Sequence, residues 1–316
     1  MNTAEIYAHV TNTIIQMLED HLETWQRPWI TVDQDSLPAR NAFNDKAYRG
    51  INQFLLSFEM MNKNYLGNSW ATFKQVKAAG GSIIKGEKST PLIFYTKAYR
   101  TGEGKYVRPE KAQVMSAAER QGQGISSYPM IKMFRVFNVA AQTEGLDKHF
   151  YEFEPSEPLS DFQKDERAEA LIGATGAKIE VVRQNKAFYN YTTDSITVPL
   201  REQFAQESQN WYATTLHELG HWTGHKTRLN RDMMHPFGSK EYGQEELIVE
   251  LASAYLCADL GFSKVIVNQA SYVNSWLGLL KEDNKAVIRA ASQAQKAADY
   301  ILEQAAGNTP VLNPAG

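Results

Sequence analysis

Two histidines four residues apart, with a glutamate beside the first, are the residues of this sequence best suited to chemistry. They stand in the run His217-Glu218-Leu219-Gly220-His221. On a helix, side chains four residues apart share one face, so both imidazoles could hold a single metal ion. Glu218 would then lie beside the ion, where it could take a proton from water and pass it to a leaving group. The motif predicts a metal-dependent hydrolytic site with Glu218 as the general base.

A catalytic zinc ion needs a third protein ligand, and a later acidic segment offers one. Residues 245–250 read Glu-Glu-Leu-Ile-Val-Glu, and Glu246 and Glu250 share a helical face. We assign Glu246 as the ligand and Glu250 as the acceptor that orients a histidine through its other ring N–H. Spacing alone leaves the reverse order of the two glutamates open.

Other histidines and a structural role for the metal are the alternatives to this assignment. His225 and His235 could supply the third ligand in place of a glutamate. The metzincin pattern is excluded, because Thr227 stands where that class has a histidine. Structural zinc sites usually fill four positions and use cysteine, whereas Cys257 is the single cysteine here. The residue types favour an open divalent-metal site, with zinc as the default and manganese, iron or nickel also compatible.

The spacing of apolar residues predicts the elements that position these ligands. We expect C-terminal helices over 161–174, 208–222, 243–260 and 281–304, and strands over 178–183 and 187–198. In the N-terminal half we expect helices over 3–24, 51–62 and 71–79, and paired strands over 91–99 and 131–139. Helices and strands that do not alternate regularly along the chain indicate an α+β fold.

Length and local composition predict two domains, because 316 residues exceed the usual size of one. Residues 152–160 hold two prolines and three glutamates without periodicity. We therefore place a linker at 151–160, between a domain at 1–150 and another at 161–306, and a tail at 307–316. Within the first domain, the glycine-rich residues 100–129 predict a mobile excursion outside the core, which could be disordered.

The charge of the chain is unevenly distributed between its two halves. Residues 1–150 hold 18 Lys+Arg and 14 Asp+Glu, while the remainder holds 15 and 22, which gives +4 and −7. Within residues 24–100 the counts are 11 and 5, and aromatic residues stand among the bases. A basic and aromatic surface suits single-stranded nucleic acid, and a merely solvated basic face is an equal alternative.

Composition also excludes several classes of protein. No apolar run approaches the ~20 residues that cross a bilayer, and no basic segment with an apolar stretch opens the chain. We expect no membrane span, no secretory signal and a cytoplasmic protein, which agrees with a sequence that cannot form an intramolecular disulfide. The run Lys85-Gly86-Glu87-Lys88 lacks the pattern of a P-loop, so we expect no ATP site.

An ordered series of segments between residues 5 and 305 indicates a family. In the N-terminal half they are Arg27-Pro28-Trp29, Ala39-Arg40-Asn41, Tyr48 to Asn52, Trp70 to Gln75, Gly80-Gly81, Lys85 to Thr90 and Phe134 to Val139. In the C-terminal half they are His217 to His221, Glu245 to Glu250, Tyr272 to Trp276 and Lys296 to Ala298. With them the chain resembles the ArdC-type antirestriction proteins of conjugative plasmids. Its N-terminal part is similar to the single-stranded-DNA-binding domain shared with certain plasmid primases, and its C-terminal part to a zincin, gluzincin-like metallopeptidase domain.

The resemblance implies that the protein binds single-stranded DNA non-specifically and protects incoming plasmid DNA from host restriction during conjugation. Aromatic residues suited to stacking on bases are Trp29, Tyr48 and Trp70, and residues suited to neutralising phosphates are Arg40, Arg49, Lys74, Lys85 and Lys88. The expected DNA-binding set also includes Asn41, Asn52 and Gln75. A place in the core is an equal alternative for Trp29 and for Trp70, because tryptophan is largely buried on average.

Two functions of other kinds compete with this expectation. The first is an intracellular zinc metalloprotease that acts on a host protein, such as a restriction subunit, with the N-terminal domain as a receptor for substrate or DNA. The second is a nuclease, which is disfavoured because nucleases assemble acidic clusters around hard cations rather than paired imidazoles.

Overall fold

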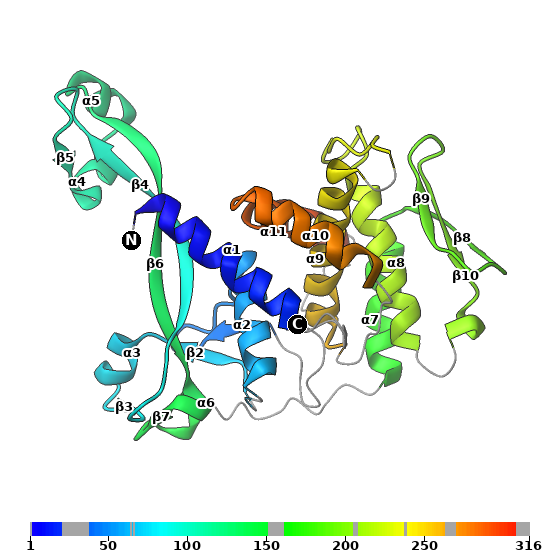
Figure 1. The fold of residues 1–316 in the computed structure, drawn as a ribbon, viewed down its shortest axis with the longest axis horizontal. Helices are drawn as coiled ribbons and strands as arrows, with labels where there is room; N and C mark the ends of the chain where they lie inside the picture. The colour runs from blue at the N-terminus through cyan, green and yellow to red at the C-terminus, as the bar shows by residue number, and fades with distance from the viewer. Residues whose placement is uncertain are drawn as a thin grey trace, which may run out of the picture.

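The N-terminal half is built around a long β-hairpin. The computed structural model describes residues 2–20, 38–63, 65, 67–150, 161–204, 208–236, 239–262 and 270–307. The elements of this half are α1 (Thr3–Asp20), β1 (Arg40–Asn41), α2 (Ile51–Asn62), β2 (Ser69–Ala71), α3 (Phe73–Ala78), β3 (Ser82–Ile83), β4 (Thr90–Arg100), β5 (Tyr106–Val107), α4 (Pro109–Gln113), α5 (Ala117–Gly122), β6 (Ser126–Asn138), α6 (Val139–Gln142), β7 (Thr143–Glu144) and the 3-10 turn η1 (Lys148–Phe150). Strands β4 and β6 pair along the hairpin in a five-stranded sheet of order β1-β2-β6-β4-β5, and β3 pairs with β7 (Figure 1).

The C-terminal half is mainly helical, with one small sheet. Its elements are α7 (Asp161–Ala174), β8 (Lys178–Val182), β9 (Phe188–Asn190), β10 (Ser195–Pro199), the 3-10 turn η2 (Arg201–Phe204), α8 (Ser208–Thr223), α9 (Lys240–Leu260), α10 (Ala270–Glu282) and α11 (Ala286–Gly307). In the sheet of order β8-β10-β9, the central β10 is parallel to β8 and antiparallel to β9. The mixture of helices and strands confirms the α+β class. Among the described residues, no helix combines the length and apolarity needed to cross a bilayer.

Helix α9 is the structural centre of the C-terminal half. It begins at the N-cap Ser239, whose side chain accepts a hydrogen bond from the backbone of Tyr242, and it ends at Gly261 with a φ of 75°. Glycine suits this end because side chains are strained in the left-handed region. The helix is buried over most of its length, including three glutamates at 245, 246 and 250. Because buried carboxylates require partners, these acids mark the part of the fold with a chemical role.

The two halves share a hydrophobic core. Ile6 of α1 and Phe54 of α2 belong to the same buried cluster as Leu251 of α9 and Ala291 of α11. Figure 1 shows α1 between the hairpin and the C-terminal helices, and α1 contacts both β6 and α10. At the same junction the backbone N–H of Gly50 donates to Gln295 Oε1 at 2.8 Å. Helix α9 therefore packs in one continuous core with elements of the N-terminal half.

Four elements differ from the sequence-based expectation. The predicted helix 71–79 begins only at Phe73, because residues 69–71 are strand β2 and Thr72 caps α3. The predicted strand 187–198 is a hairpin, β9 and β10, with its turn at Asp194 in the left-handed region (φ 48°). The predicted helix 281–304 is interrupted after Glu282 and continues as α11 from Ala286. The predicted excursion 100–129 contains β5, α4 and α5, so disorder does not describe it, and its mobility stays a prediction.

The boundaries of the expected domains stay predictions. The proposed linker at 151–160 lies outside the described residues, as do 308–316 of the proposed tail, while Gly307 closes α11. Cys257 is fully buried in the core.

Candidate metal centre

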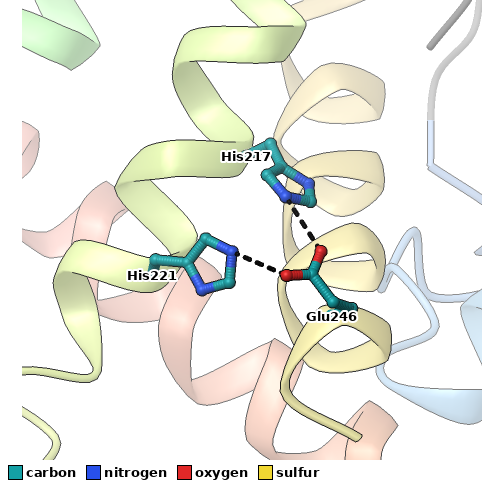
Figure 2. Close-up of side chains that lie close together, drawn as sticks. All are labelled: His217, His221 and Glu246. Atoms are coloured by element: carbon teal, nitrogen blue, oxygen red, sulfur yellow. Dashed lines mark ion pairs between the residues drawn. The ribbon is translucent and has the colours of Figure 1, made fainter. Parts of the chain in front are cut away.

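The two motif histidines project from α8 toward α9 and face one glutamate. His217 and His221 lie one helical turn apart, with ring centroids separated by 5.1 Å. Glu246 of α9 reaches between them, with one carboxylate oxygen 3.5 Å from His217 Nε2 and the other 3.5 Å from His221 Nε2 (Figure 2). One donor atom from each of the three residues lies within 4.8 Å of the other two. This convergence fits a single divalent cation with an open fourth position.

Two α-helices approach closely enough for this convergence because Gly220 has no side chain. A Cβ built at Gly220 would lie 3.0 Å from Val249 Cβ, closer than ordinary carbon contacts. Val249 belongs to α9 and is fully buried, so it has no free space into which to move. The glycine inside the histidine motif therefore sets the spacing between α8 and α9.

Replacing Gly220 with Ala should lower the free energy of unfolding by about 1–3 kcal/mol, because an added methyl group overpacks the contact with Val249. It should also weaken metal binding, since α9 carries Glu246 and would move away from the histidines. Thermal or urea unfolding and a metal titration measure the two effects. Gly278→Ala is the matched control: it is helical with no atom near the added methyl, and should raise stability by about 0.5–1 kcal/mol. Equal and stabilising effects of both substitutions would contradict the tight contact.

The outer nitrogen of His217 faces a second buried carboxylate. Glu250 Oε2 lies 3.3 Å from His217 Nδ1, and Glu250 is 1% exposed. This separation is longer than that of an ordinary hydrogen bond, so the two side chains are in close contact. Glu246 and Glu250 thus lie at opposite ring nitrogens of His217. Their roles as ligand and orienting group stay predictions.

The outer nitrogen of His221 faces a pair of residues that sequence reasoning missed. Glu245 Oε1 lies 3.4 Å from His221 Nδ1. Arg231 binds the Glu245 carboxylate through two hydrogen bonds, of 3.0 Å from Nε and 2.8 Å from Nη2. Arg231 also donates to the carbonyl of Gly220 at 2.6 Å and to Thr223 Oγ1 at 2.8 Å. The outer nitrogen of each histidine therefore faces a glutamate, Glu250 for His217 and Glu245 for His221. Arg231 holds Glu245 against α8.

The glutamate carboxylates around His217 and His221 favour positive charge at this site. Burial alone lowers the pKa of His217, but contacts with Glu246 and Glu250 outweigh it and raise that pKa to about 9. For His221, burial likewise lowers the pKa, and Glu245 and Glu246 raise it to about 10. Burial raises the pKa of Glu246, but the two imidazoles hold it well below its ordinary value. A divalent cation between neutral imidazoles would supply the positive charge that these carboxylates attract, so the donor set fits the expected metal.

Glu218 has the environment of a group that holds and moves a proton. Its side chain is 6% exposed, and burial raises the pKa of its carboxyl group. The two nearby imidazoles and a hydrogen bond from the backbone N–H of Tyr189 oppose this rise. Tyr189 lies on β9, an outer strand of the small sheet. A raised carboxyl pKa beside a metal site suits a general base that later acts as an acid.

The alternative histidine ligands lie elsewhere in the described structure. His225 Nδ1 contacts Thr227 Oγ1 at 2.8 Å, and its ring lies against Tyr191. His235 Nε2 faces the backbone carbonyl of Asp232 at 3.1 Å. Within the described ranges, the group able to hold a metal comprises His217, His221 and Glu246. The geometry therefore favours a glutamate as the third ligand.

Some of the expected DNA-binding residues gather at the start of α3. Asn41 and Gln75 exchange side-chain hydrogen bonds, and Asn41 Nδ2 also donates to the Tyr48 hydroxyl group at 3.3 Å. Arg40 is adjacent on β1 and forms an ion pair with Asp45 at 2.9 Å. Lys74, Lys85 and Lys88 have exposed side chains. The binding of DNA by these residues stays a prediction.

Three other residues of that set have structural partners, and one is not described. Trp70 has no exposed surface, so it is a core residue and presents no ring face to a base. Asn52 binds both backbone groups of Ile93, at 3.0 Å and 2.6 Å, and thereby joins α2 to β4. Arg49 forms an ion pair with Asp299 of α11. Trp29 lies outside the described residues.

Comparisons with protein families match the two halves separately. Residues 4–137 match the N-terminal domain of anti-restriction factor ArdC, and residues 166–293 match a zincin-like metallopeptidase family. Both matches agree with the expected two-domain architecture. Among curated proteins, two DNA primases TraC of Escherichia coli are each 36% identical to this chain, over 94% and 93% of it. The chain spans only 27% and 19% of those primases. Uncharacterized protein y4eC of Sinorhizobium fredii is 32% identical, over 95% of this chain and 92% of its own length.

Solved structures extend the similarity over both halves at once. The metal-free crystal structure of the antirestriction ArdC protein from the R388 plasmid is 34% identical in sequence, with a TM-score of 0.74. The match covers 95% of this chain and 98% of the R388 chain. The Mn(II)-bound structure of the same protein has a TM-score of 0.72, with 96% and 99% covered. Because sequence and structure agree over nearly the whole of both chains, this protein belongs to the ArdC family of antirestriction proteins.

Proposed function

We propose that this chain binds single-stranded DNA non-specifically through its N-terminal half and holds a divalent metal at His217, His221 and Glu246. In this role it protects incoming plasmid DNA from host restriction during conjugation, in the cytoplasm of the recipient cell. The observation that carries the metal site is the convergence of both Nε2 atoms on one carboxylate. The match of residues 4–137 to the ArdC N-terminal domain supports the DNA-binding role.

The residues around the site have separate tasks in this proposal. A bound metal would supply Lewis-acid activation of a carbonyl group and of water. Glu218 accepts and returns the proton, and the Tyr189 N–H holds its carboxylate in place. Glu250 orients His217, and Glu245 with Arg231 orients His221. Such outer partners fix the ring orientation and the basicity of histidine ligands.

Zinc is the default ion, because a set of two histidines and one glutamate is typical of catalytic zinc sites. Manganese is the second candidate, since the related R388 protein has a Mn(II)-bound structure. Elemental analysis of the purified protein before and after chelation distinguishes the two. A protein that holds no divalent metal at saturating zinc or manganese would contradict the proposal.

A second candidate function is an intracellular metalloprotease that acts on a host protein such as a restriction subunit. The observation in its favour is β9, an outer strand of its sheet that contacts Glu218 through Tyr189. An outer strand can pair with an extended peptide, which would bring a peptide bond beside the general base.

Replacing Glu218 with Ala separates DNA shielding from proteolysis. We expect the variant to bind single-stranded DNA as the unchanged protein does, because Glu218 is buried in the C-terminal half. Protection of plasmid DNA in a conjugation assay should survive if occupancy of the strand is the mechanism, and should be lost if the metal site cleaves a host protein. A gel shift at several salt concentrations tests DNA binding itself. Failure to bind single-stranded DNA at low ionic strength, where phosphate contacts are strongest, would contradict the proposed function.

A further inference from the structure

One side of the β4–β6 hairpin carries exposed aromatic and basic side chains. Because side chains alternate along strands, residues that are paired across the hairpin share a side. Phe94 pairs with Lys132, Ala98 with Tyr128, and Arg100 with both Ser126 and Tyr106 of β5. Phe134 lies on the same side, with its ring 5.8 Å from that of Phe94 in an edge-to-face arrangement. We call this set the ribbon surface: Phe94, Arg100, Tyr106, Tyr128, Lys132 and Phe134.

Several residues on the opposite side of the hairpin contact helices α1 and α2. The hydroxyl groups of Tyr95 and Tyr7 of α1 lie 3.5 Å apart, and the Ile93 backbone is bound by Asn52 of α2. Ile131 is 4% exposed within the shared core. Figure 1 shows α1 running beside the hairpin, with α4, α5 and β5 at the far end of the hairpin. The ribbon surface includes Phe94 at 42% and Tyr106 at 56% exposure, while Leu92, Ala98 and Val136 on the same side are buried beneath and beside it, and Tyr95 on the opposite side is 56% exposed.

The charge of the hairpin identifies the partner that this surface fits. Strands β4 and β6 contain four basic residues and no acidic residue; Arg100 and Lys132 lie on the ribbon surface, and Lys97 and Arg135 lie on the opposite side. Arg100 lies 5.5 Å from the ring centre of Tyr128 and donates to its hydroxyl group at 2.9 Å. Exposed rings beside cationic side chains match the bases and phosphates of a single strand. A duplex keeps its bases stacked in its interior, where such rings cannot reach them.

We propose that the ribbon surface is an interface for single-stranded DNA, on which bases stack against Phe94 and Tyr106 while Lys132 and Arg100 contact phosphates. The path from Phe94 to Arg100 covers six residues of strand, or about 20 Å. None of its residues belongs to the set expected from the sequence, so the interface extends the DNA-binding surface away from the start of α3. The inference rests on the proposed function, because it names where that function's DNA lies.

The first test replaces the exposed ring. Fluorescence anisotropy with a labelled oligo(dT) should give a dissociation constant about tenfold weaker for Phe94→Ala, because base stacking on an aromatic ring is lost. The dependence of that constant on salt should be unchanged, since no phosphate contact is removed. Phe94→Trp keeps a ring and should bind as tightly as the unchanged protein. Phe188→Ala is the matched control, a 44% exposed ring on β9 in the C-terminal half, and should have no effect on DNA binding.

The second test replaces the charge between the rings. Lys132→Gln should reduce the slope of log K against log salt by about 0.7, the value of one contact to a single-stranded phosphate. If the unchanged protein binds oligo(dT) while Phe94→Ala and Lys132→Gln bind with the same affinity and salt slope, the ribbon surface is not the interface and the proposed function survives. If the unchanged protein itself fails to bind at low salt, the proposed function fails first. Circular dichroism establishes that each variant is folded.

Discussion

Replacing Glu246 with Ala should weaken zinc binding by more than about 100-fold. The expectation follows from geometry, since the two oxygens of this carboxylate lie 3.5 Å from the Nε2 atoms of His217 and His221. Loss of an outer partner of a metal ligand typically weakens affinity by about 10–100-fold, and loss of a ligand should exceed that range. Competition against a chromophoric chelator measures the affinity. Glu241→Ala is the control, an exposed glutamate in the first turn of the same helix, and should leave the affinity unchanged.

The same titration distinguishes Glu246 from Glu250. Because Glu250 faces the outer nitrogen of His217, Glu250→Gln should weaken zinc binding by only about 10–100-fold. A larger loss from Glu250→Gln than from Glu246→Ala would reverse the assignment of ligand and orienting group.

Replacing Arg231 with Met should lower the free energy of unfolding by about 3–5 kcal/mol, the usual effect of removing one partner of a buried ion pair. The Arg231 and Glu245 side chains are each 7% exposed, so the buried carboxylate would lose its arginine partner and keep its contact with His221. The carbonyl of Gly220 and the hydroxyl group of Thr223 would lose a donor as well. Urea unfolding of the metal-free protein measures the loss without a contribution from zinc.

Two further variants show whether the loss comes from the buried carboxylate that Arg231 no longer pairs with. Adding Glu245→Gln to Arg231→Met should recover part of the stability, because the buried carboxylate is then absent. Lys240→Met breaks the exposed ion pair with Glu282 and should leave stability nearly unchanged, since solvent screens such pairs. An Arg231→Met protein as stable as Lys240→Met would contradict the structural role of the buried pair.

Periodicity explains why much of the metal site could be predicted. The positions of His217 and His221 follow from helical geometry alone, and an acidic helix elsewhere in the sequence was the natural source of a third ligand. Arg231 could not be found in this way, because it lies in an irregular segment between α8 and α9 where no repeat relates it to Glu245. The signal in the sequence that pointed to a partner such as Arg231 was Glu245, a third glutamate beside Glu246 and Glu250.

In the N-terminal half, residue type alone does not predict which aromatic side chains are exposed. Trp70 was expected from the sequence to stack on a base and Phe94 was not, yet Trp70 is fully buried and Phe94 is 42% exposed. Their exposure depends on which strand lies next to which and on the register between them. Alternation predicted strands near 91–99 and 131–139, but the pairing of Phe94 with Lys132 depends on the connection between them, which local patterns do not determine.

The domain boundary illustrates a similar limit. A proline-rich segment near residue 155 suggested separate units, and the family comparisons match two domains. Yet Leu247 and Leu251 of α9 pack in the same core as Ile6 of α1. Composition indicates where a chain connects two regions, whereas packing between them depends on surfaces that are far apart in the sequence.

Anomalous diffraction at the zinc absorption edge, from crystals of the protein grown with zinc, tests the metal centre most directly. The account predicts one strong peak within bonding distance, about 2.0–2.2 Å, of His217 Nε2, His221 Nε2 and a Glu246 carboxylate oxygen. A peak bound by other residues, or an unoccupied space between α8 and α9 at saturating zinc, would contradict it.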